Sequence, residues 1–538
     1  MRVFGFVLAA VFMASGQMAA AAQRSYSYEI RHDCWSDADE RDYRAFIAAI
    51  GNSDCNTLDA CLRSSANPFR DTDSPDVVFK SDCAELPYIL RFYFAWKRGL
   101  PFSFESAVAA RNGETGDLRY SRNGNEVIER FDVPSGANGY AIIARLRGAV
   151  SSASYRIHPG LQSPRETDFY SPKISSAAIR PGTVVYDPAG HVGIVFDVDA
   201  KGRVHFFDAH TDYSLTQMTY DLRFSRMKPS AGAGFKNWRP MRLVGYTKRA
   251  DGVLVGGHIE LAANAEIAEF SDEQFFGTGK RPRDPDWKDG AFTLNGEVLD
   301  YYDYVRAQLA GGTLVFEPVS EIADMARSNC LDLRYRAQAV ALAIARGIET
   351  RPEPRRLPLN IYGTDGDWEM YSTPSRDARL KTSFKYLRDT AQRFVEMAMR
   401  HDLHLAYDGS DIAGDLLRAY DRATRFCRIT YTNSDGSRAT LNYEDARQRL
   451  FAMSFDPYQC IEHRWGDANA ATCNDGANKR AWYDAEQSLR NQIERTYDTQ
   501  MDFTLEELQA RKPGVVTPPD TDVRAYLLSA GAQPDSAP

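Results

Sequence analysis

The stretch PGTVVYDPAGHVGIVFDVDAKGRVHFFDAH, residues 181–210, decides how the first part of this chain folds. Three runs rich in apolar residues are separated in it by two short turns that contain glycine, proline and aspartate. This alternation of apolar runs and turns is typical of consecutive antiparallel strands. The stretch therefore predicts a strand, a turn, a second strand that begins at His191, another turn, and a third strand that ends near His210.

The second turn sets the register of the last two strands. If Val198 faces Arg203 across this turn, then Gly193 faces Asp208 on the neighbouring strand. Directly opposed residues share a face of a sheet, as do residues two apart along one strand. His191 and Asp208 are therefore predicted to lie on one face, and the missing side chain at Gly193 leaves Asp208 room to reach His191.

The segment SDCAEL, residues 81–86, is the predicted entrance to a helix. The apolar residues that follow recur at helical spacing, and Gly99, with Pro101 just beyond it, marks the end of this helix. Pro87 would remove a hydrogen bond from the first turn. We therefore expect the helix to begin near Glu85.

Cys83 is thus expected on the loop that enters this helix. A thiol at a helix N-terminus lies near the positive end of the helix dipole, which lowers its pKa and favours the nucleophilic thiolate. Backbone N–H groups in the same place can bind an oxyanion. The structural alternative is a disulfide between Cys83 and Cys34, Cys55 or Cys61, because exported proteins commonly pair their cysteines.

Cys83, His191 and Asp208 together suit amide hydrolysis. An imidazole can take the proton of a thiol and later give it to the leaving amine, and a carboxylate on the other ring nitrogen fixes the tautomer. His210 lies on the same predicted face and is the alternative to Asp208 in this orienting role. We predict a Cys83–His191–Asp208 catalytic triad, and no motif in the sequence predicts a metal ion or cofactor.

Two motifs resemble those of the NlpC-type and CHAP amidohydrolases: Asp82-Cys83 at the start of a helix, and the strand around GHVGIV, residues 190–195. The resemblance covers residues 82–210. It implies a papain-like α+β domain, the same three site residues, and cleavage of amide bonds in cell-wall peptides. The turn Gly99-Leu100-Pro101 gives a secondary resemblance to transglutaminase-like proteases, which implies acyl transfer or proteolysis.

The chain departs from the NlpC-type pattern in two places. Glu85 stands after the cysteine where those enzymes usually carry small residues, and we expect it to reshape the substrate entrance. Residues 102–180 form a longer stretch than the compact members of the family need. We interpret this stretch as an insertion that covers the cleft as a flap.

A chain of 538 residues is too long for one hydrophobic core and predicts at least two domains. The second half shows amphipathic helical stripes, such as the one from Leu380 through Phe384, Leu387 and Phe394. The predicted parts are a signal peptide at 1–22, a cysteine-bearing segment at 23–75, a papain-like catalytic domain at 76–250, a connector at 251–300, an all-helical domain at 301–511 and a flexible, proline-rich tail at 512–538.

The N-terminus predicts the compartment. Arg2, an apolar run at residues 3–13 and alanines at 19–22 are typical of a cleaved secretory signal. We therefore expect an exported, periplasmic or secreted protein without a transmembrane segment. A net charge of −8 argues against nucleic acid as a partner. The expected partner is a peptide or peptidoglycan substrate, and the alternative is an envelope scaffold that keeps the fold without turnover.

Eight cysteines in an exported chain predict disulfides. If Cys83 is the nucleophile, an odd number remains, so one further cysteine must be unpaired, and we expect it to be Cys330. Two local pairs are predicted: Cys55 with Cys61, and Cys460 with Cys473.

Overall fold

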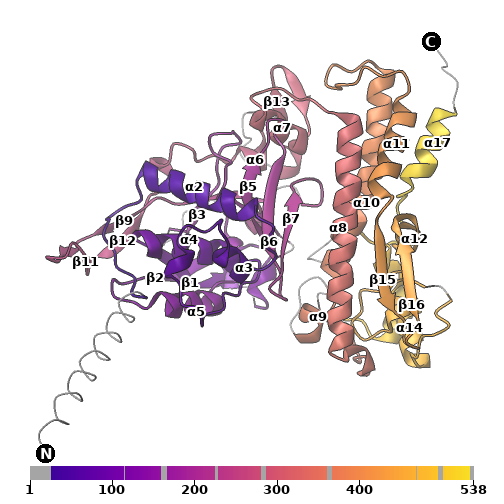
Figure 1. Ribbon diagram of the computed structural model, residues 1–538, viewed down its shortest axis with the longest axis horizontal. Helices are drawn as coiled ribbons and strands as arrows, with labels where there is room; N and C mark the ends of the chain where they lie inside the picture. The colour runs from indigo at the N-terminus through magenta and orange to yellow at the C-terminus, as the bar shows by residue number, and fades with distance from the viewer. Residues whose placement is uncertain are drawn as a thin grey trace, which may run out of the picture. The chain divides into compact units, whose positions relative to one another are not determined.

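The structure is a computed structural model that describes residues 26–113, 115–158, 166–188, 190–224, 228–279, 286–359, 366–467, 469–494 and 501–532. The predicted signal peptide at 1–22 lies outside these residues. The chain divides into two compact units, one formed by residues 1–220 and 225–312 and the other by 221–224 and 313–538 (Figure 1). Helices and strands both contribute to the fold, which confirms the α+β class. None of the described helices combines the length and apolarity needed to cross a bilayer.

The first unit is built on a six-stranded antiparallel sheet, in which the strand order is β3-β8-β4-β5-β6-β7. The predicted strand–turn–strand–turn–strand stretch forms its three consecutive strands β4, β5 and β6. The strands are β3 (Phe169–Tyr170), β4 (Val184–Asp187), β5 (His191–Val198), β6 (Val204–Ala209), β7 (Leu215–Thr219) and β8 (Gly234–Trp238).

The register between β5 and β6 is as predicted at one end of the pair and differs at the other. Gly193 faces Asp208, but Val198 faces Val204 rather than Arg203. The difference comes from a one-residue shift between Val195 and Asp197, where β5 contains an extra residue, as in a β-bulge. The extra residue in β5 cancels the one-residue difference at the turn, and for this reason Gly193 faces Asp208 as predicted.

Helix α4 (Glu85–Arg98) is the buried helix of this unit, and all but its last two residues are buried. It ends where the sequence predicted, because Gly99 adopts the left-handed conformation with φ 68° that favours glycine at a helix C-terminus. Helix α2 (Asp37–Gly51) packs against β5, and Glu40 on it accepts a hydrogen bond of 3.0 Å from the buried Arg91 of α4 (Figure 1).

The N-terminal segment 23–75 contributes to this same core. Tyr28, Phe46 and Ile47 belong to one cluster of buried residues with the side chains of α4 and of the sheet. The elements that precede and flank the sheet in the chain are α3 (Leu58–Arg63), β1 (Ser103–Ala110), β2 (Asn125–Asp132) and α5 (Gly139–Ala149).

The predicted connector at 251–300 is folded, which corrects that prediction. The first unit continues to Gly312, and buried Leu254 belongs to its core cluster. Short strand pairs could not be recognised here because two to four residues are too few to show a periodic pattern. The elements are β9 (Met241–Val244) paired with β12 (His258–Leu261), β10 (Thr247–Lys248) with β11 (Leu254–Val255), β13 (Phe292–Leu294) with β14 (Glu297–Leu299), and helices α6 (Glu273–Phe276) and α7 (Tyr301–Leu309).

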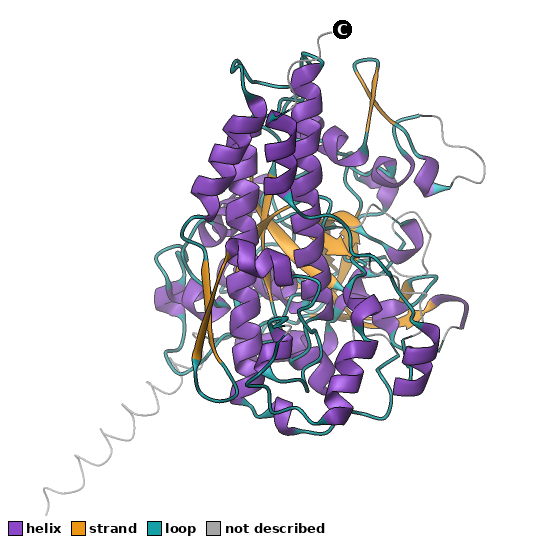
Figure 2. Cartoon of the chain, turned by 90° about the vertical axis from the view of Figure 1, so that its right-hand side faces the viewer, coloured by secondary structure: helices purple, strands orange, loops and turns teal. Residues whose placement is uncertain are grey.

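The second unit is built on long helices that pack side by side (Figure 2). Arg336 on α8 and Asp377 on α10 join two of these helices through a buried ion pair, with Nε–Oδ1 at 2.8 Å. The predicted stripe on α10 is confirmed, since Phe384, Leu387 and Phe394 are buried. The three longest described helices of this unit are α8 (Pro318–Ala345), α10 (Pro374–Met399) and α11 (Ile412–Thr424).

Two predictions for the second half are wrong. The unit is not all-helical, because β15 (Arg428–Thr432) and β16 (Arg438–Asn442) form an antiparallel hairpin. Part of the predicted tail is helix α17 (Val523–Gly531), whose Val523 and Leu527 are buried and which packs against α10 and α11. The remaining described α-helices of the second unit are short: α9 (Gly366–Met370), α12 (Tyr443–Arg449), α13 (Ile461–Arg464), α14 (Ala477–Ala485), α15 (Gln487–Arg490) and α16 (Leu505–Arg511).

Gly193 is required by the packing of the sheet. A Cβ atom at this position would lie 2.4 Å from the ring of Phe206 on the neighbouring strand, so the sequence-based reason for this glycine, room for Asp208, is incomplete. We expect Gly193→Ala to lower the free energy of unfolding by about 1–3 kcal/mol, as overpacking does. Urea denaturation followed by circular dichroism measures this change.

The matched control is Gly148→Ala in the exposed last turn of α5, where an added Cβ meets nothing within 4 Å. Alanine favours a helix over glycine by up to about 1 kcal/mol, so this variant should be neutral or slightly more stable. Equal stabilities of the two variants would contradict the packing argument.

Candidate active site

The turn that carries Cys83 is fixed by a reciprocal cap at the entrance of α4. One carboxylate oxygen of Asp82 accepts hydrogen bonds from the backbone N–H groups of Ala84 and Glu85, both at 3.0 Å. Glu85 returns the contact by accepting from the N–H of Asp82, also at 3.0 Å. This is the arrangement of a capping box, and it holds the half-buried Cys83 in the first turn.

Pro87 explains why the assigned helix begins at Glu85, as predicted. Proline has no N–H, so the usual helical hydrogen bond to the Cys83 carbonyl cannot form. The bond from Leu86 N–H to the Asp82 carbonyl, at 3.2 Å, still places Cys83 inside the turn that leads into the helix. The thiol is therefore near the positive end of the helix dipole.

The thiol of Cys83 lies against the turn between β4 and β5. Its Sγ atom is 3.7 Å from the carbonyl oxygen of Gly190, a residue 107 positions away in the chain. Gly190 has φ 80° and directly precedes His191, the first residue of β5. The fold therefore brings the predicted nucleophile to the backbone beside the predicted base.

His191 and Asp208 are hydrogen-bonded as the strand register predicted. Nε2 of the buried His191 contacts Oδ2 of Asp208, whose side chain is fully buried. Burial alone would raise the pKa of Asp208, but the His210 and His191 rings and the hydrogen bonds from His191 and Thr216 outweigh this effect and lower it well below its ordinary value. Asp208 is therefore a carboxylate at neutral pH.

His210 lies on the other side of the same carboxylate. Thr216 on β7 donates to Oδ1 of Asp208 at 2.5 Å, and Nε2 of His210 lies 2.8 Å from the same hydroxyl. His210 and His191 stack with ring centroids 5.7 Å apart. Asp208 thus contacts His191 directly, whereas His210 is linked to Asp208 by Thr216 and its Nε2 lies 3.7 Å from Oδ1 of Asp208. The part played by Thr216 was not predicted.

Two consecutive residues that the sequence did not single out join the Cys83 turn to the His191 turn. The hydroxyl of Tyr155 donates to the Ala84 carbonyl at 2.6 Å, and the guanidinium of Arg156 donates to the Pro188 carbonyl at 3.2 Å. Both side chains are fully or almost fully buried. No sequence pattern marked this pair, because it lies between regular elements.

These two contacts also correct the interpretation of residues 102–180 as a flap. The stretch contains β1, β2, α5 and β3, and its buried Tyr155 supports the Cys83 turn from within the core. Burial, and next the electrostatic effect of the Cys83 group, raise the pKa of Tyr155 well above its ordinary value, which keeps the phenol protonated as a donor.

The Glu85 side chain points into the cap of α4. Its Oε2 atom accepts from the Asp82 N–H and also lies 3.4 Å from Nε of Arg147. Only 6% of the residue is exposed, so the expectation that it reshapes a substrate entrance is wrong. Burial and the neighbouring Asp82 carboxylate raise the pKa of Glu85 to about 7. Glu85 therefore places a carboxyl group that titrates near neutral pH in the turn of Cys83.

The polar cluster also contains atoms that could bind a metal ion. One donor atom each from His191, Asp208 and His210 lie within 4.8 Å of one another. Two imidazoles and a carboxylate suit several transition metals. The Thr216 hydroxyl, however, already bridges His210 and Asp208, and Nε2 of His191 contacts the other oxygen of this carboxylate.

Six of the eight cysteines form disulfides, and Cys83 is not among them. Both predicted local pairs form, Cys55–Cys61 and Cys460–Cys473. Cys330 pairs with Cys427, 97 residues away, so its prediction as an unpaired thiol is wrong. Cys34 and Cys83 are the two cysteines outside these bonds, and Cys34 is exposed.

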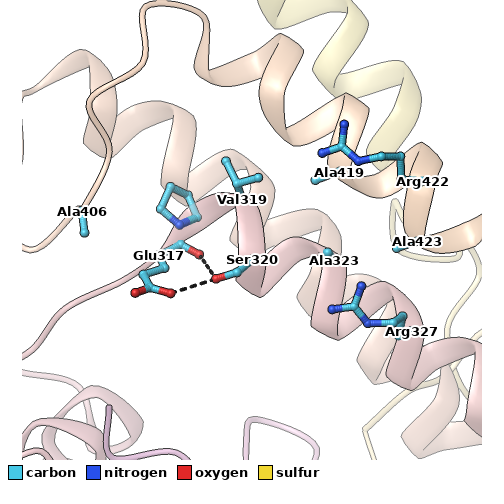
Figure 3. A pocket seen from close by; sticks show the side chains of 10 residues that line it. Glu317, Val319, Ser320, Ala323, Arg327, Ala406, Ala419, Arg422 and Ala423 are labelled. Atoms are coloured by element: carbon cyan, nitrogen blue, oxygen red, sulfur yellow. Dashed lines mark hydrogen bonds between the residues drawn. The ribbon is translucent and has the colours of Figure 1, made fainter. Parts of the chain in front are cut away.

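The second unit contains a pocket lined by α8, α11 and the loop that contains Ala406 (Figure 3). Its volume is about 520 Å³. Small residues such as Ala323 and Ala419 line it, while Arg327 and Arg422 lie toward one end and Glu317 toward the other (Figure 3). This pocket contains none of the predicted site residues.

Comparisons of the chain with protein-family models, with curated proteins and with solved structures find no match. The candidate site is therefore defined by its own geometry: a thiol beside the Gly190 carbonyl, and an imidazole hydrogen-bonded to a buried carboxylate.

The charge of Glu85 gives a testable effect on Cys83. As the pH rises through about 7, Glu85 loses its proton and places a negative charge in the turn of the thiol, which opposes thiolate formation. Glu85→Gln keeps an acceptor for the Asp82 N–H without this charge. We expect alkylation of Cys83 by iodoacetamide at pH 8 to be about two- to fivefold faster in this variant, and unchanged below pH 6.

Peptide mass spectrometry measures this pH profile, and the exposed Glu129→Gln is the matched control. Identical profiles for Glu85→Gln and the natural protein would show that the carboxylate does not act on the thiol.

Tyr155 is predicted to position the Cys83 turn. Tyr155→Phe removes the hydrogen bond to the Ala84 carbonyl and should lower the free energy of unfolding by about 1 kcal/mol. A positioning role also predicts a changed ratio of Cys83 to Cys34 alkylation, with Cys34 as the internal reference. Tyr26→Phe is the control, and a loss of stability with an unchanged ratio would leave Tyr155 a purely structural role.

Proposed function

We propose that the chain is an exported cysteine hydrolase that cleaves amide bonds with Cys83, His191 and Asp208. The observation that carries the proposal is the approach of Cys83 Sγ to within 3.7 Å of the carbonyl that precedes His191, a residue whose Nε2 is engaged by Asp208. The thiol lies at the entrance of α4, and the imidazole and the carboxylate lie on the paired strands β5 and β6. This is the set that nucleophilic amide hydrolysis requires.

His191 acts as the base through its second ring nitrogen. Because Nε2 is hydrogen-bonded to Asp208, Nδ1 is the nitrogen that exchanges a proton with the thiol. The thiolate attacks the carbonyl carbon of the amide, and His191 then gives its proton to the leaving amine. A water molecule, deprotonated by His191, hydrolyses the thioester and releases the acid, and the thiol is restored.

Asp208 orients the His191 ring and stabilises the imidazolium that forms during the reaction. Its lowered pKa keeps the carboxylate charged across the pH range in which a histidine titrates. Thr216 and His210 hold the second oxygen of this carboxylate, so they position Asp208.

The oxyanion is bound near the start of α4. The N–H groups of Ala84 and Glu85 already bind Asp82, so they cannot serve without opening the cap. The candidate donor from this turn is therefore the N–H of Cys83, where the helix dipole adds to its effect.

A papain-like arrangement is supported by the nucleophile at the entrance of a buried helix and by the base on a strand of an antiparallel sheet. The substrate class, a cell-wall peptide, rests on the resemblance to NlpC-type and CHAP enzymes and on export. Three disulfides fit a periplasmic or secreted protein, since such bonds persist in oxidising compartments.

Digestion of peptidoglycan tests the proposal. The protein should release peptide fragments detected by liquid chromatography and mass spectrometry. Cys83→Ala and His191→Ala should lower kcat/KM by at least about a thousandfold, and Asp208→Asn by about a hundred- to ten-thousandfold. The matched control is Cys34→Ala, which removes the other thiol outside the disulfides and should keep full activity.

The outcomes separate the alternatives. Incorporation of an amine donor into acceptor proteins, without fragment release, would favour the transglutaminase-like acyl transfer. Release of fragments by Cys83→Ala at the natural rate would refute the cysteine mechanism. Binding to peptidoglycan without turnover would favour an envelope scaffold that keeps the fold.

A further inference from the structure

Four side chains with metal-binding atoms converge in the second unit, outside the candidate active site: Cys460, His463, Cys473 and Asp475. One donor atom from each lies within 4.8 Å of the others. Cys460 and His463 come from the start and body of α13, and Cys473 and Asp475 come from the loop before α14. Cys460 and Cys473 form a disulfide with each other.

The two remaining donors already face this disulfide. Nδ1 of His463 lies 3.1 Å from Oδ2 of Asp475 and 3.9 Å from Sγ of Cys473. The same Asp475 oxygen accepts a hydrogen bond of 3.0 Å from the N–H of Cys460. Cys460, His463 and Asp475 are buried and Cys473 is half-buried, so the cluster is enclosed on most sides.

Contacts around the cluster hold its two segments in place. The His463 ring stacks on Tyr483 with centroids 4.1 Å apart and an angle of 10°. Glu462 on α13 accepts a hydrogen bond of 2.5 Å from Thr472, which directly precedes Cys473. The hydrogen bond between Thr472 and Glu462 therefore joins α13 to the loop before α14 independently of the disulfide.

We propose that the Cys460–Cys473 disulfide is the oxidised state of a zinc site, and that its reduction allows Cys460, His463, Cys473 and Asp475 to bind one Zn²⁺. Two thiolates, one imidazole nitrogen and one carboxylate oxygen are a tetrahedral donor set that zinc prefers. The short spacings from Cys460 to His463 and from Cys473 to Asp475 supply two chelating pairs, as structural zinc sites commonly do.

An external dithiol supplies the two electrons that reduce the Cys460–Cys473 disulfide. Its thiolate attacks Sγ of the half-buried Cys473, the S–S bond breaks, and Cys460 leaves as a thiolate. The second thiol of the reductant then displaces Cys473 and leaves as a cyclic disulfide. Zn²⁺ binding replaces the protons of the two thiols and releases both to solvent.

The Cys330–Cys427 disulfide is the internal contrast. Both of its cysteines are buried, and neither belongs to a group of convergent metal-binding side chains among the described residues. Reduction there should produce two thiols without a metal site. The proposal is therefore specific to one of the disulfides, and it does not depend on the proposed hydrolase function.

Cobalt binding to the full-length protein tests the site. The protein is treated with a phosphine reductant, which adds no thiol ligand, and is titrated with Co²⁺. We expect one Co²⁺ per chain, with thiolate charge-transfer bands and the visible bands of tetrahedral cobalt, and its displacement by Zn²⁺. The unreduced protein should not show these bands. Their absence after reduction, with the disulfide shown by mass spectrometry to be open, would overturn the proposal.

Variants assign the ligands. In the reduced protein, Asp475→Asn and Cys473→Ser should each weaken Zn²⁺ binding at least about tenfold, and Cys473→Ser should also lose part of the charge-transfer band. Asp475→Asn keeps the disulfide, so an unchanged melting curve of its unreduced form shows that it folds. Unchanged zinc affinity in both variants would overturn the proposal.

Two matched controls exclude Cys83 and the Cys330–Cys427 pair. A Cys330→Ser, Cys427→Ser double variant and a Cys83→Ser variant should both keep the cobalt spectrum after reduction. Loss of the spectrum in the Cys83→Ser variant would place the metal in the first unit and overturn the assignment to Cys460 and Cys473.

Discussion

The buried carboxylate of Asp208 is the constraint on which the candidate active site depends. An isolated charge in this fully buried position would cost several kcal/mol, so its partners are obligatory. His191 on β5 and Thr216 on β7 contact its two oxygens, and His210 lies beyond the threonine. One carboxylate on β6 therefore joins three neighbouring strands and also holds the His191 imidazole in one orientation.

Two opposing electrostatic effects act on Cys83 at the entrance of α4. The helix dipole favours a thiolate at Cys83, but the cap that starts this helix places the carboxyl groups of Asp82 and Glu85 in the same turn. Burial and the Asp82 charge raise the pKa of Glu85 to about 7, so near neutral pH a fraction of the molecules carries one negative charge fewer beside the thiol. The cap that orders the turn thus also places a carboxyl group that titrates near neutral pH in the turn of the cysteine.

Much of the site geometry follows from local sequence patterns. Apolar runs and turn residues placed the three consecutive strands, and helical spacing together with Pro87 placed the start of the helix near Glu85. These features are predictable because each depends on interactions between residues close in sequence. The predicted pair of Gly193 and Asp208 forms because a bulge in β5 offsets the different pairing at the turn.

The sequence by itself determined the strand–turn–strand unit, the helix behind Cys83 and the two local disulfides, because hydrogen-bonding period and short loops limit the alternatives. Only the tertiary structure decided the pairing of Cys330 with Cys427, and the support that Tyr155 gives to the Cys83 turn. These contacts join segments far apart in the chain. Their partners are chosen by how whole elements pack into a core, and no spacing along the sequence encodes that choice.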